Sequence, residues 1–426
     1  MIKRLFKSAV IKNASWLIVG KVFQMAISLI VGLFTARYLG PSNYGIINYA
    51  AAYTAFFMSF CTLGINSVLV KEFVDNPNQE GGIIGSTLLL RAVSSFLSAG
   101  VIVFLVSVID AGEKETISVV ALCSIGLIFN IFETIGYWFQ AKLHSKVTAM
   151  VTLIAYAGTS VYKIALIILQ KDVEWFAFST SLDYIILGVL LLICYKKYDG
   201  QRLYFSKEIT ARVLKKSIYF VLPGIMVSVY GYADKFMLKH MLSETDVGFY
   251  ATATSMCGMW CFVLTAVIDS MYPPIMEAFK TDKKLYEKKN RQLYAIVFYL
   301  SVAVSTCFCL FGDWIVLLLY GEAYFPAVAP LKVVTWYTAF SYLGVARNAW
   351  IVCEEKQKYL KYIYLLAAVS NVLLNFVFIP RWGATGAAAA TLITQILTTL
   401  VVPFFIKTLR KNLILILEGI FLKNIR

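Results

Sequence analysis

The chain has 426 residues, of which 60% are hydrophobic and only 15% are charged. Soluble globular proteins are about 45–50% apolar and about 25% charged, so this composition excludes an ordinary soluble domain and indicates an integral membrane protein. The net charge of +15 would suggest nucleic-acid binding in a soluble protein, but in a membrane protein basic residues collect in cytoplasmic loops.

Twelve apolar segments are each long enough to cross a bilayer core, which requires about 20 helical residues. The connections between them carry turn residues or charges, for example LGPSNYG, DNPNQEGG and PRWGATG. The basic N-terminus lacks the small-residue cleavage site of a signal peptide. The predicted spans are residues 11–36, 44–70, 83–109, 117–140, 148–169, 174–195, 211–234, 248–275, 292–319, 331–353, 358–380 and 384–406.

The distribution of positive charge predicts the orientation of these spans. With the N-terminus placed in the cytoplasm, most of the 39 Lys and Arg residues fall in cytoplasmic segments and few fall in the outer loops. This asymmetry follows the positive-inside rule, so both termini are predicted to be cytoplasmic, and nucleic acid is not expected as a partner. The apolar stretch Leu413–Leu422 is too short to span, so residues 409–426 are predicted to form a cytoplasmic interfacial tail.

The longest connection is cytoplasmic and includes the predicted linker, residues 199–212, between the sixth and seventh spans. We therefore expect residues 1–198 to form an N-terminal six-helix lobe and residues 213–408 a C-terminal one. A weak internal repeat aligns Gly45 with Gly248, each between the first two helices of its half. Parallel repeats in transporters place the substrate site at their interface. The predicted fold is an all-α membrane protein with about 12 transmembrane helices in two six-helix lobes around a central cavity.

Four basic residues lie inside predicted spans, and embedded charges usually face the interior of a helix bundle or a water-filled cavity. Lys21 is nine residues beyond Lys12. That distance is about 14 Å along a helix, so the Lys21 side chain can hardly reach an interface. Arginine can bind phosphate through two parallel hydrogen bonds, and lysine binds it as a point charge. The candidate ligands for an anionic substrate are Lys21, Arg91, Lys163 and Arg347. For Lys163 and Arg347, which lie nearer to helix ends, snorkelling is the alternative.

Four acids are also embedded. Asp183 is the deepest and is a candidate for coupling to a proton or another cation, with an internal salt bridge as the alternative. Asp234 is a second candidate, and its neighbour Lys235 is expected to serve a different partner because successive helical residues point about 100° apart. Glu133 and Asp269 are expected to make structural pairs.

Prolines interrupt two of the predicted helices, at Pro223 and at the pair Pro273–Pro274. A proline removes a backbone hydrogen bond and can kink or end a helix, so these positions are candidate hinges for gating. No cofactor or metal site is predicted, because the chain has two histidines and no phosphate-binding loop. The eight cysteines all fall within predicted spans and are expected to pack as small apolar residues.

Short motifs spread along the chain resemble those of a known family. The chain is similar to the polysaccharide repeat-unit flippases, the Wzx or O-antigen transporter family, within the superfamily that includes the multidrug and toxic compound extruders. The motifs are N-x2-W-L (Asn13–Leu17), A-R-Y-L-G-P-x2-Y-G (Ala36–Gly45), D-K-x2-L (Asp234–Leu238), V-G-F-Y (Val247–Tyr250), Y-P-P-I (Tyr272–Ile275), L-Y-G-E-A-Y (Leu319–Tyr324) and N-F-x3-P-R-W-G-A-T-G-A-A (Asn375–Ala388).

This resemblance implies a multi-pass protein of the bacterial cytoplasmic (inner) membrane. It would move undecaprenyl-diphosphate-linked oligosaccharide repeat units from the inner to the outer leaflet for O-antigen, capsule or exopolysaccharide assembly. Of the candidate residues, Arg37, Asp234 and Lys235 fall within the family motifs, and Arg37 is expected to tie the outer end of the first helix to its loop. The implied partners are the lipid-linked oligosaccharide, membrane lipids, a polysaccharide polymerase and a chain-length regulator.

Two other functions fit parts of the sequence. A cation-coupled multidrug exporter of the same superfamily would share the fold, but export of cationic drugs favours embedded acids over four embedded cations. A membrane polysaccharide polymerase or glycosyltransferase would use the same lipid, but such an enzyme needs a sizeable loop outside the membrane. The outer loops here are short, so an enzyme is not predicted.

Overall fold

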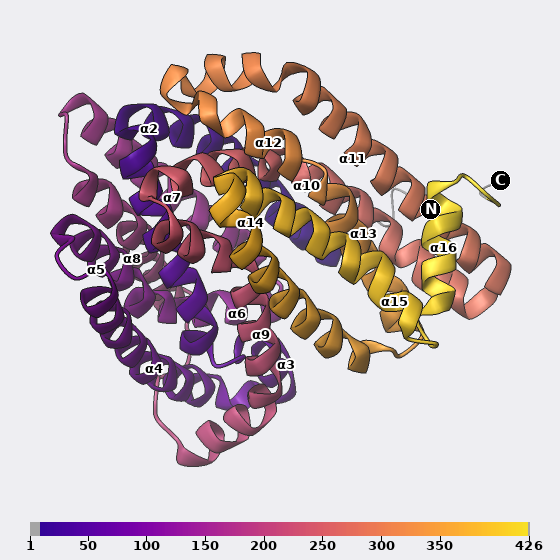
Figure 1. The fold of residues 1–426 in the computed structure, drawn as a ribbon. Helices are drawn as coiled ribbons and strands as arrows, with labels where there is room; N and C mark the ends of the chain where they lie inside the picture. Colours follow the sequence, from indigo (N-terminus) through magenta and orange to yellow (C-terminus); the bar gives the residue numbers. More distant parts are fainter. Residues whose placement is uncertain (1–8, 425–426) are drawn as a thin grey trace. The chain divides into compact units, whose positions relative to one another are not determined.

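The apolar segments fold as helices. The computed structural model describes the backbone of residues 9–424, and the side chains of residues 24–424 other than residue 26. All regular secondary structure within the described backbone is helical (Figure 1). Nine segments of the described chain are long and apolar enough to cross a membrane. The all-α membrane prediction is therefore confirmed, with nine to twelve helices, whereas the cytoplasmic location of the termini stays a prediction.

The chain divides into two units. The first comprises residues 1–39 and 46–228, and the second residues 40–45 and 229–426. The division crosses two long helices, because residues 40–45 lie within the helix Ala9–Thr62 and the boundary after residue 228 lies within the helix Lys207–Met241. The lobes predicted around linker 199–212 stay a prediction. The helices of the first unit are α2 (Ala9–Thr62), α3 (Asn66–Asp75), α4 (Glu80–Ile109), α5 (Lys114–Phe129), α6 (Glu133–Ala141), α7 (Ser145–Ile168), α8 (Val173–Lys197) and the first part of α9 (Lys207–Met241), with short 3₁₀ turns η1 (Pro77–Gln79) and η2 (Asn130–Phe132).

The second unit contains the rest of α9 and the remaining helices. They are α10 (Glu244–Thr281), α11 (Lys283–Tyr320), η3 (Glu322–Ala327), α12 (Val328–Val334), α13 (Tyr337–Cys353), η4 (Gln357–Tyr359), α14 (Leu360–Ile396), a π-helical turn η5 (Leu397–Val401), α15 (Val402–Phe405) and α16 (Arg410–Ile420). The predicted span 331–353 is divided between α12 and α13, which are separated at Thr335 and Trp336.

Glycines produce the two sharpest turns within α2 and α14. Gly40 has φ 71° and Gly383 has φ 57°, so both lie in the left-handed region that favours glycine. Each glycine separates two predicted spans within one continuous run of helix. The turn chemistry read from LGPSNYG and PRWGATG therefore marks real reversals of the backbone.

The predicted proline sites behave differently. Helix α9 continues through Pro223, and α10 continues through Pro273 and Pro274 to Thr281. Pro273 and Pro274 were expected to end or bend their helix. The helical backbone beyond them excludes an end, and a bend stays a prediction. Their gating role and that of Pro223 stay predictions.

The two glycines that the internal repeat aligns meet in one contact within the second unit. A Cβ atom on Gly45 would lie 1.8 Å from the carbonyl oxygen of Glu244, and one on Gly248 would lie 2.0 Å from that of Pro41. Real Cβ atoms do not approach carbonyl oxygens so closely, so both positions require glycine. Glu244 also accepts hydrogen bonds from Ser42, at 3.3 Å, and from Lys239, at 3.1 Å.

The C-terminal helix α16 packs against α11 (Figure 1). Arg291 pairs with Glu418 at 2.5 Å, and Lys411 pairs with Glu287 at 3.1 Å. Leu415 and Ile416 are buried against the unit, whereas Ile414, Leu417 and Phe421 are exposed. Helix α16 thus buries apolar side chains against the unit and leaves others exposed, and its location at the membrane surface stays a prediction.

A strap between α8 and α9 lies across the start of α4 in the first unit. We define this strap as residues 201–206. Gly81 N–H donates to the side-chain oxygen of Gln201 at 3.1 Å, and Ser206 N–H donates to Ser86 Oγ at 3.0 Å. A Cβ atom on Gly85 would lie 2.3 Å from the carbonyl oxygen of Tyr204. The glycines of the sequence GGIIG therefore let backbone pack on backbone.

We expect Gly85→Ala to destabilise the strap, because the added methyl group must displace the Tyr204 carbonyl at a cost of about 1–3 kcal/mol. Thermal unfolding of the full chain and the rate of trypsin cleavage at Arg202 and Lys207 measure the effect. Gly100→Ala in the same helix is the matched control, since its Cβ would meet nothing within 4 Å. Equal unfolding temperatures and equal cleavage rates for the two variants would contradict the close packing.

Candidate functional site

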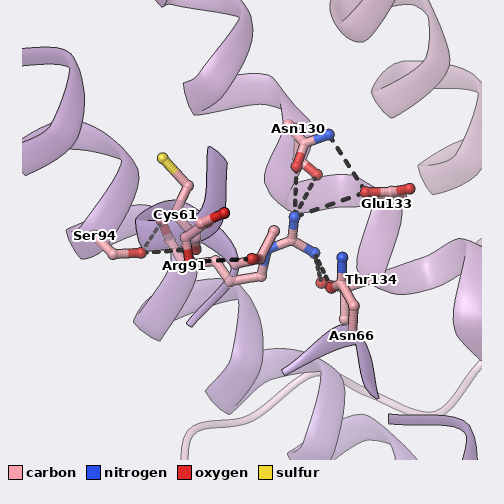
Figure 2. A network of polar contacts seen from close by, with 9 residues as sticks. Cys61, Asn66, Arg91, Ser94, Asn130, Glu133 and Thr134 are labelled. Atoms are coloured by element: carbon pink, nitrogen blue, oxygen red, sulfur yellow. Dashed lines mark hydrogen bonds and ion pairs between the residues drawn. The ribbon is translucent and has the colours of Figure 1, made fainter. Parts of the chain in front are cut away.

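Arg91 lies at the centre of a buried polar network in the first unit (Figure 2). Its side chain is fully buried in α4. One terminal nitrogen, Nη1, donates to Thr134 Oγ1 at 3.0 Å and to Asn66 Oδ1 at 3.4 Å. The other, Nη2, donates to the backbone oxygen of Asn130 at 3.2 Å and to its side-chain oxygen. The guanidinium therefore joins α3, α4, η2 and α6.

Glu133 supplies the negative charge of this network. Its Oε2 atom lies 3.9 Å from Arg91 Nη2 and accepts a hydrogen bond from Asn130 at 3.3 Å. The expected structural pairing of Glu133 is thus confirmed. The carboxylate is also 42% exposed and lines a cavity of about 180 Å³ together with Tyr137, Gln140 and Thr148. Arg91 reaches this cavity only through its acid partner.

Lys163 and Asp183 lie near one another in the first unit, on α7 and α8. Both side chains are partly buried, and their charges interact favourably. Thr159 Oγ1 donates a hydrogen bond to Asp183 Oδ1 at 3.2 Å. No ion pair within 4.0 Å forms between Lys163 and Asp183 in the described part of the chain. Their predicted roles in substrate binding and ion coupling stay predictions.

Asp234 is a buried carboxylate surrounded by neutral donors in the second unit. It is 3% exposed and accepts hydrogen bonds from the hydroxyl of Tyr250, from Thr391 Oγ1 at 2.8 Å and from the amide of Asn375. Asn375 also donates to Asn371 at 3.0 Å. Among residues with described side chains, no Lys, Arg or His nitrogen lies within 4.0 Å of the carboxylate. Its direct partners among these residues are therefore neutral hydrogen-bond donors.

The sequence analysis missed the neutral members of this cluster. Asn371 and Asn375 are one helical turn apart on α14, and Thr391 follows the break at Gly383. Two asparagines at i and i+4 in an apolar segment were a usable signal, since buried polar groups require partners. Lys235, the neighbour of Asp234, is only partly buried.

Arg347 is a deeply buried cation of the second unit. It is 4% exposed on α13, and its Nη1 donates to the backbone oxygen of Thr398 at 3.3 Å. Its Nε atom is buried and has no hydrogen-bond partner among the residues with described side chains. Arg347 lines a cavity of about 130 Å³, which Asn348, Tyr364 and Gln395 also border.

The remaining predicted residues do not join these clusters. Arg37 is exposed and makes no hydrogen bond or ion pair with the residues that the structure describes, so its predicted tie to the loop stays a prediction. Asp269 is exposed and unpaired within the same described residues, so its expected structural pair is wrong. Lys21 lies on α2, but its side chain falls outside the described residues.

The fold is that of a multi-pass α-helical membrane protein with several buried charges. The family model described as "Polysaccharide biosynthesis protein" matches residues 10–279, which is more than half of the chain. The chain therefore belongs to this family of membrane proteins of polysaccharide biosynthesis. The resemblance drawn from the sequence motifs is confirmed.

Relatives match over nearly the full length. The "Capsular polysaccharide biosynthesis protein CapF" of Staphylococcus aureus is 21% identical over 93% of this chain and 99% of that protein. The "Putative O-antigen transporter" of Shigella flexneri is 22% identical over 92% of this chain and 96% of that protein. An uncharacterised membrane protein of Methanocaldococcus jannaschii is 18% identical over 98% of this chain and 89% of that protein, so relatives are not confined to bacteria.

Two solved structures share the fold. The lipid II flippase MurJ, in an inward closed conformation, has a TM-score of 0.72 at 14% identity and covers 95% of this chain and 90% of its own. An inward-facing multidrug resistance MATE family transporter of the MOP superfamily has a TM-score of 0.71 at 13% identity. The match covers 97% of this chain and 99% of the transporter. At these identities the likeness shows the fold alone.

We expect Arg91→Met to lower the free energy of unfolding by about 3 kcal/mol or more, because Glu133 loses its ion pair and the buried acceptors on Asn130 lose their donor. The thermal unfolding midpoint of the purified full chain measures this loss. Arg381→Met removes an exposed arginine and is the control. A normal unfolding midpoint for Arg91→Met would show that the network does not hold these helices together.

Proposed function

We propose that the chain flips undecaprenyl-diphosphate-linked oligosaccharide repeat units from the inner to the outer leaflet of a bacterial cytoplasmic membrane. The product would feed O-antigen, capsule or exopolysaccharide assembly. The observation that carries this proposal is membership of the polysaccharide biosynthesis family over residues 10–279. The names of the CapF and O-antigen relatives, and the lipid-linked substrate named for the MurJ fold relative, support the substrate class.

The proposed mechanism is alternating access with cations that bind the diphosphate or the glycan. Lys21, Arg91, Lys163 and Arg347 are the proposed ligands, and a charge held in the membrane is stabilised when a substrate anion neutralises it. The contacts of these residues differ. Arg91 is already bonded to four acceptor atoms and an acid, so its proposed role is mainly to position α4, whereas Arg347 has open donors.

Asp234 is the proposed site of ion coupling, with Asp183 as the second candidate. The Asp234 carboxylate has neutral, oxygen-bearing neighbours and no cationic partner within 4.0 Å among the described residues. Its oxygens are therefore suited to bind a hard cation or a proton. Asn371 and Thr391 would add oxygen ligands. A polymerase and a chain-length regulator are the proposed protein partners, because flipped repeat units must be joined outside the membrane.

Cation-coupled drug export is the second candidate, because the MATE transporter shares the fold. The four embedded cations would repel a cationic drug, so they argue against cationic drugs as the transported substrate. The two functions predict different phenotypes on deletion, namely loss of the surface glycan or increased drug sensitivity.

The primary test is glycan export in a strain that lacks the gene, complemented with the wild-type chain or with Lys21→Ala, while lipid-linked repeat units are assigned to a leaflet. We expect deletion to leave repeat units in the inner leaflet and only the wild type to release them. Lys21→Arg should retain much of the export because it keeps the charge. Single unpolymerised repeats in the outer leaflet of the deletion strain would instead identify a polymerase function.

We expect Asp234→Asn to reduce transport driven by an ion gradient by roughly ten- to a hundredfold, since an amide keeps the shape of the side chain but removes its charge. Uptake of the lipid-linked substrate into proteoliposomes under separate sodium and proton gradients measures the coupling. Asp269→Asn, an exposed acid of the same unit, is the control. Unchanged gradient dependence in Asp234→Asn would exclude Asp234 as the coupling site.

A further inference from the structure

The Arg347 cavity holds a buried positive charge that has no negative partner within 4.0 Å among the described residues. This cavity of about 130 Å³ lies within the second unit, and its wall includes Asn348, Tyr364, Gln395 and Thr398. We propose that the cavity is a subsite for one anionic group of the transported substrate, a phosphate or a carboxylate. This inference rests on the proposed function and assigns one group of the substrate to one cavity.

The first argument compares two buried arginines. Arg91 donates to four acceptor atoms and has Glu133 at 3.9 Å. Arg347 is almost as deeply buried, yet it donates to a single carbonyl and has no carboxylate within 4.0 Å among the described residues. A buried charge without a partner costs several kcal/mol. An incoming anion would remove that cost.

The second argument is the geometry of the free donors. A guanidinium carries five N–H donors, and Arg347 uses one of its Nη1 donors for Thr398. Within the described part of the chain, its Nε atom has no hydrogen-bond partner and its Nη2 atom donates no hydrogen bond. The edge formed by Nε and Nη2 can bind two oxygens of a carboxylate or phosphate through parallel hydrogen bonds. That edge of Arg91 is half occupied, because its Nη2 is bonded to Asn130.

The third argument concerns the wall opposite Arg347. Thr398 and Thr399 belong to the π-helical turn Leu397–Val401, and both border the cavity. Single π-helical turns inside α-helices occur frequently at functional sites. Here the turn places the carbonyl of Thr398 against one end of the guanidinium. This contact orients Arg347 and leaves its other edge open.

The size and lining of the cavity limit what it can bind. Pockets for drug-sized ligands are about 300–1,000 Å³, so a cavity of about 130 Å³ suits one charged group and not a whole sugar chain. None of the described residues that line it is acidic, whereas the amides of Asn348 and Gln395 and the hydroxyl of Tyr364 can donate hydrogen bonds. The lining therefore favours an anion.

Two parts of a lipid-linked oligosaccharide could supply that anion, namely the diphosphate and the carboxylate of an acidic sugar. Binding of pyrophosphate and of glucuronate to the purified full-length chain, measured by isothermal titration calorimetry, separates the two sources. We expect one probe to bind the wild-type chain. Arg347→Gln should weaken that binding roughly ten- to a hundredfold, and Arg347→Lys should restore part of it.

Two further variants keep the test decisive. Arg381→Gln removes an exposed arginine of the same unit and should bind the probe as the wild type does. Asn348→Ala keeps the charge and removes one polar group of the wall, so it should weaken binding by a smaller factor even if Arg347→Gln does not fold. Thermal unfolding identifies variants that fail to fold.

Failure of this inference is distinguishable from failure of the proposed function. If neither probe binds the wild type, or if Asn348→Ala and every folded Arg347 variant bind as tightly as the wild type, the subsite is refuted. Glycan export by the complemented strain then still supports flipping. If the probe binds through Arg347 while the deletion strain exports glycan normally, the anion site stands and the proposed function fails.

Discussion

The low dielectric of the bilayer requires every buried charge to have a partner, and this constraint orders the polar interior of both units. Arg91 meets the requirement with Glu133 and neutral acceptors from three neighbouring elements. Asp234 meets it with hydrogen bonds from Tyr250, Asn375 and Thr391. Arg347 meets it only in part. Charges with several partners, such as Arg91, hold helices together. Charges with more unpaired groups, such as Arg347, are available to a ligand.

Hydropathy and turn chemistry predicted most of the fold, because a membrane span must be long and apolar whatever it packs against. All twelve predicted segments fall largely on helices, although a turn at residues 63–65 interrupts span 44–70 and η2 interrupts span 117–140. The turns at Gly40 and Gly383 lie where the turn residues placed them. The separation of α12 from α13 at Thr335–Trp336 was not predicted, since no glycine or proline marks it. Helix α10 also continues through Pro273, so of the two expected effects of this proline, an end or a bend, the backbone excludes the end.

The sequence identified the embedded charges but not their partners. An ionisable residue in an apolar run is conspicuous, whereas its partner is often a neutral side chain such as Asn371 or Thr391, or a backbone carbonyl such as that of Thr398. Which face of a helix meets its neighbour depends on rotation about the helix axis, and hydropathy is nearly uniform around a buried span. Asp269 illustrates the limit, because a predicted depth in the span did not prevent its side chain from being exposed.

A transporter must bind its cargo and then release it, so its binding groups have to exchange partners without disturbing the fold. Replacing the partners of Arg91 with a substrate would break contacts that join α3, α4 and α6. Binding an anion to Arg347 would break none of its described contacts, since Nε is unpartnered and Nη1 can keep its bond to Thr398. When the Nε–Nη2 edge is empty, the buried charge is unpaired, which destabilises the site without its ligand. Removing water from the anion also costs free energy, which limits how tightly the anion binds. The balance of these two costs permits reversible binding, which a fully satisfied cation cannot provide.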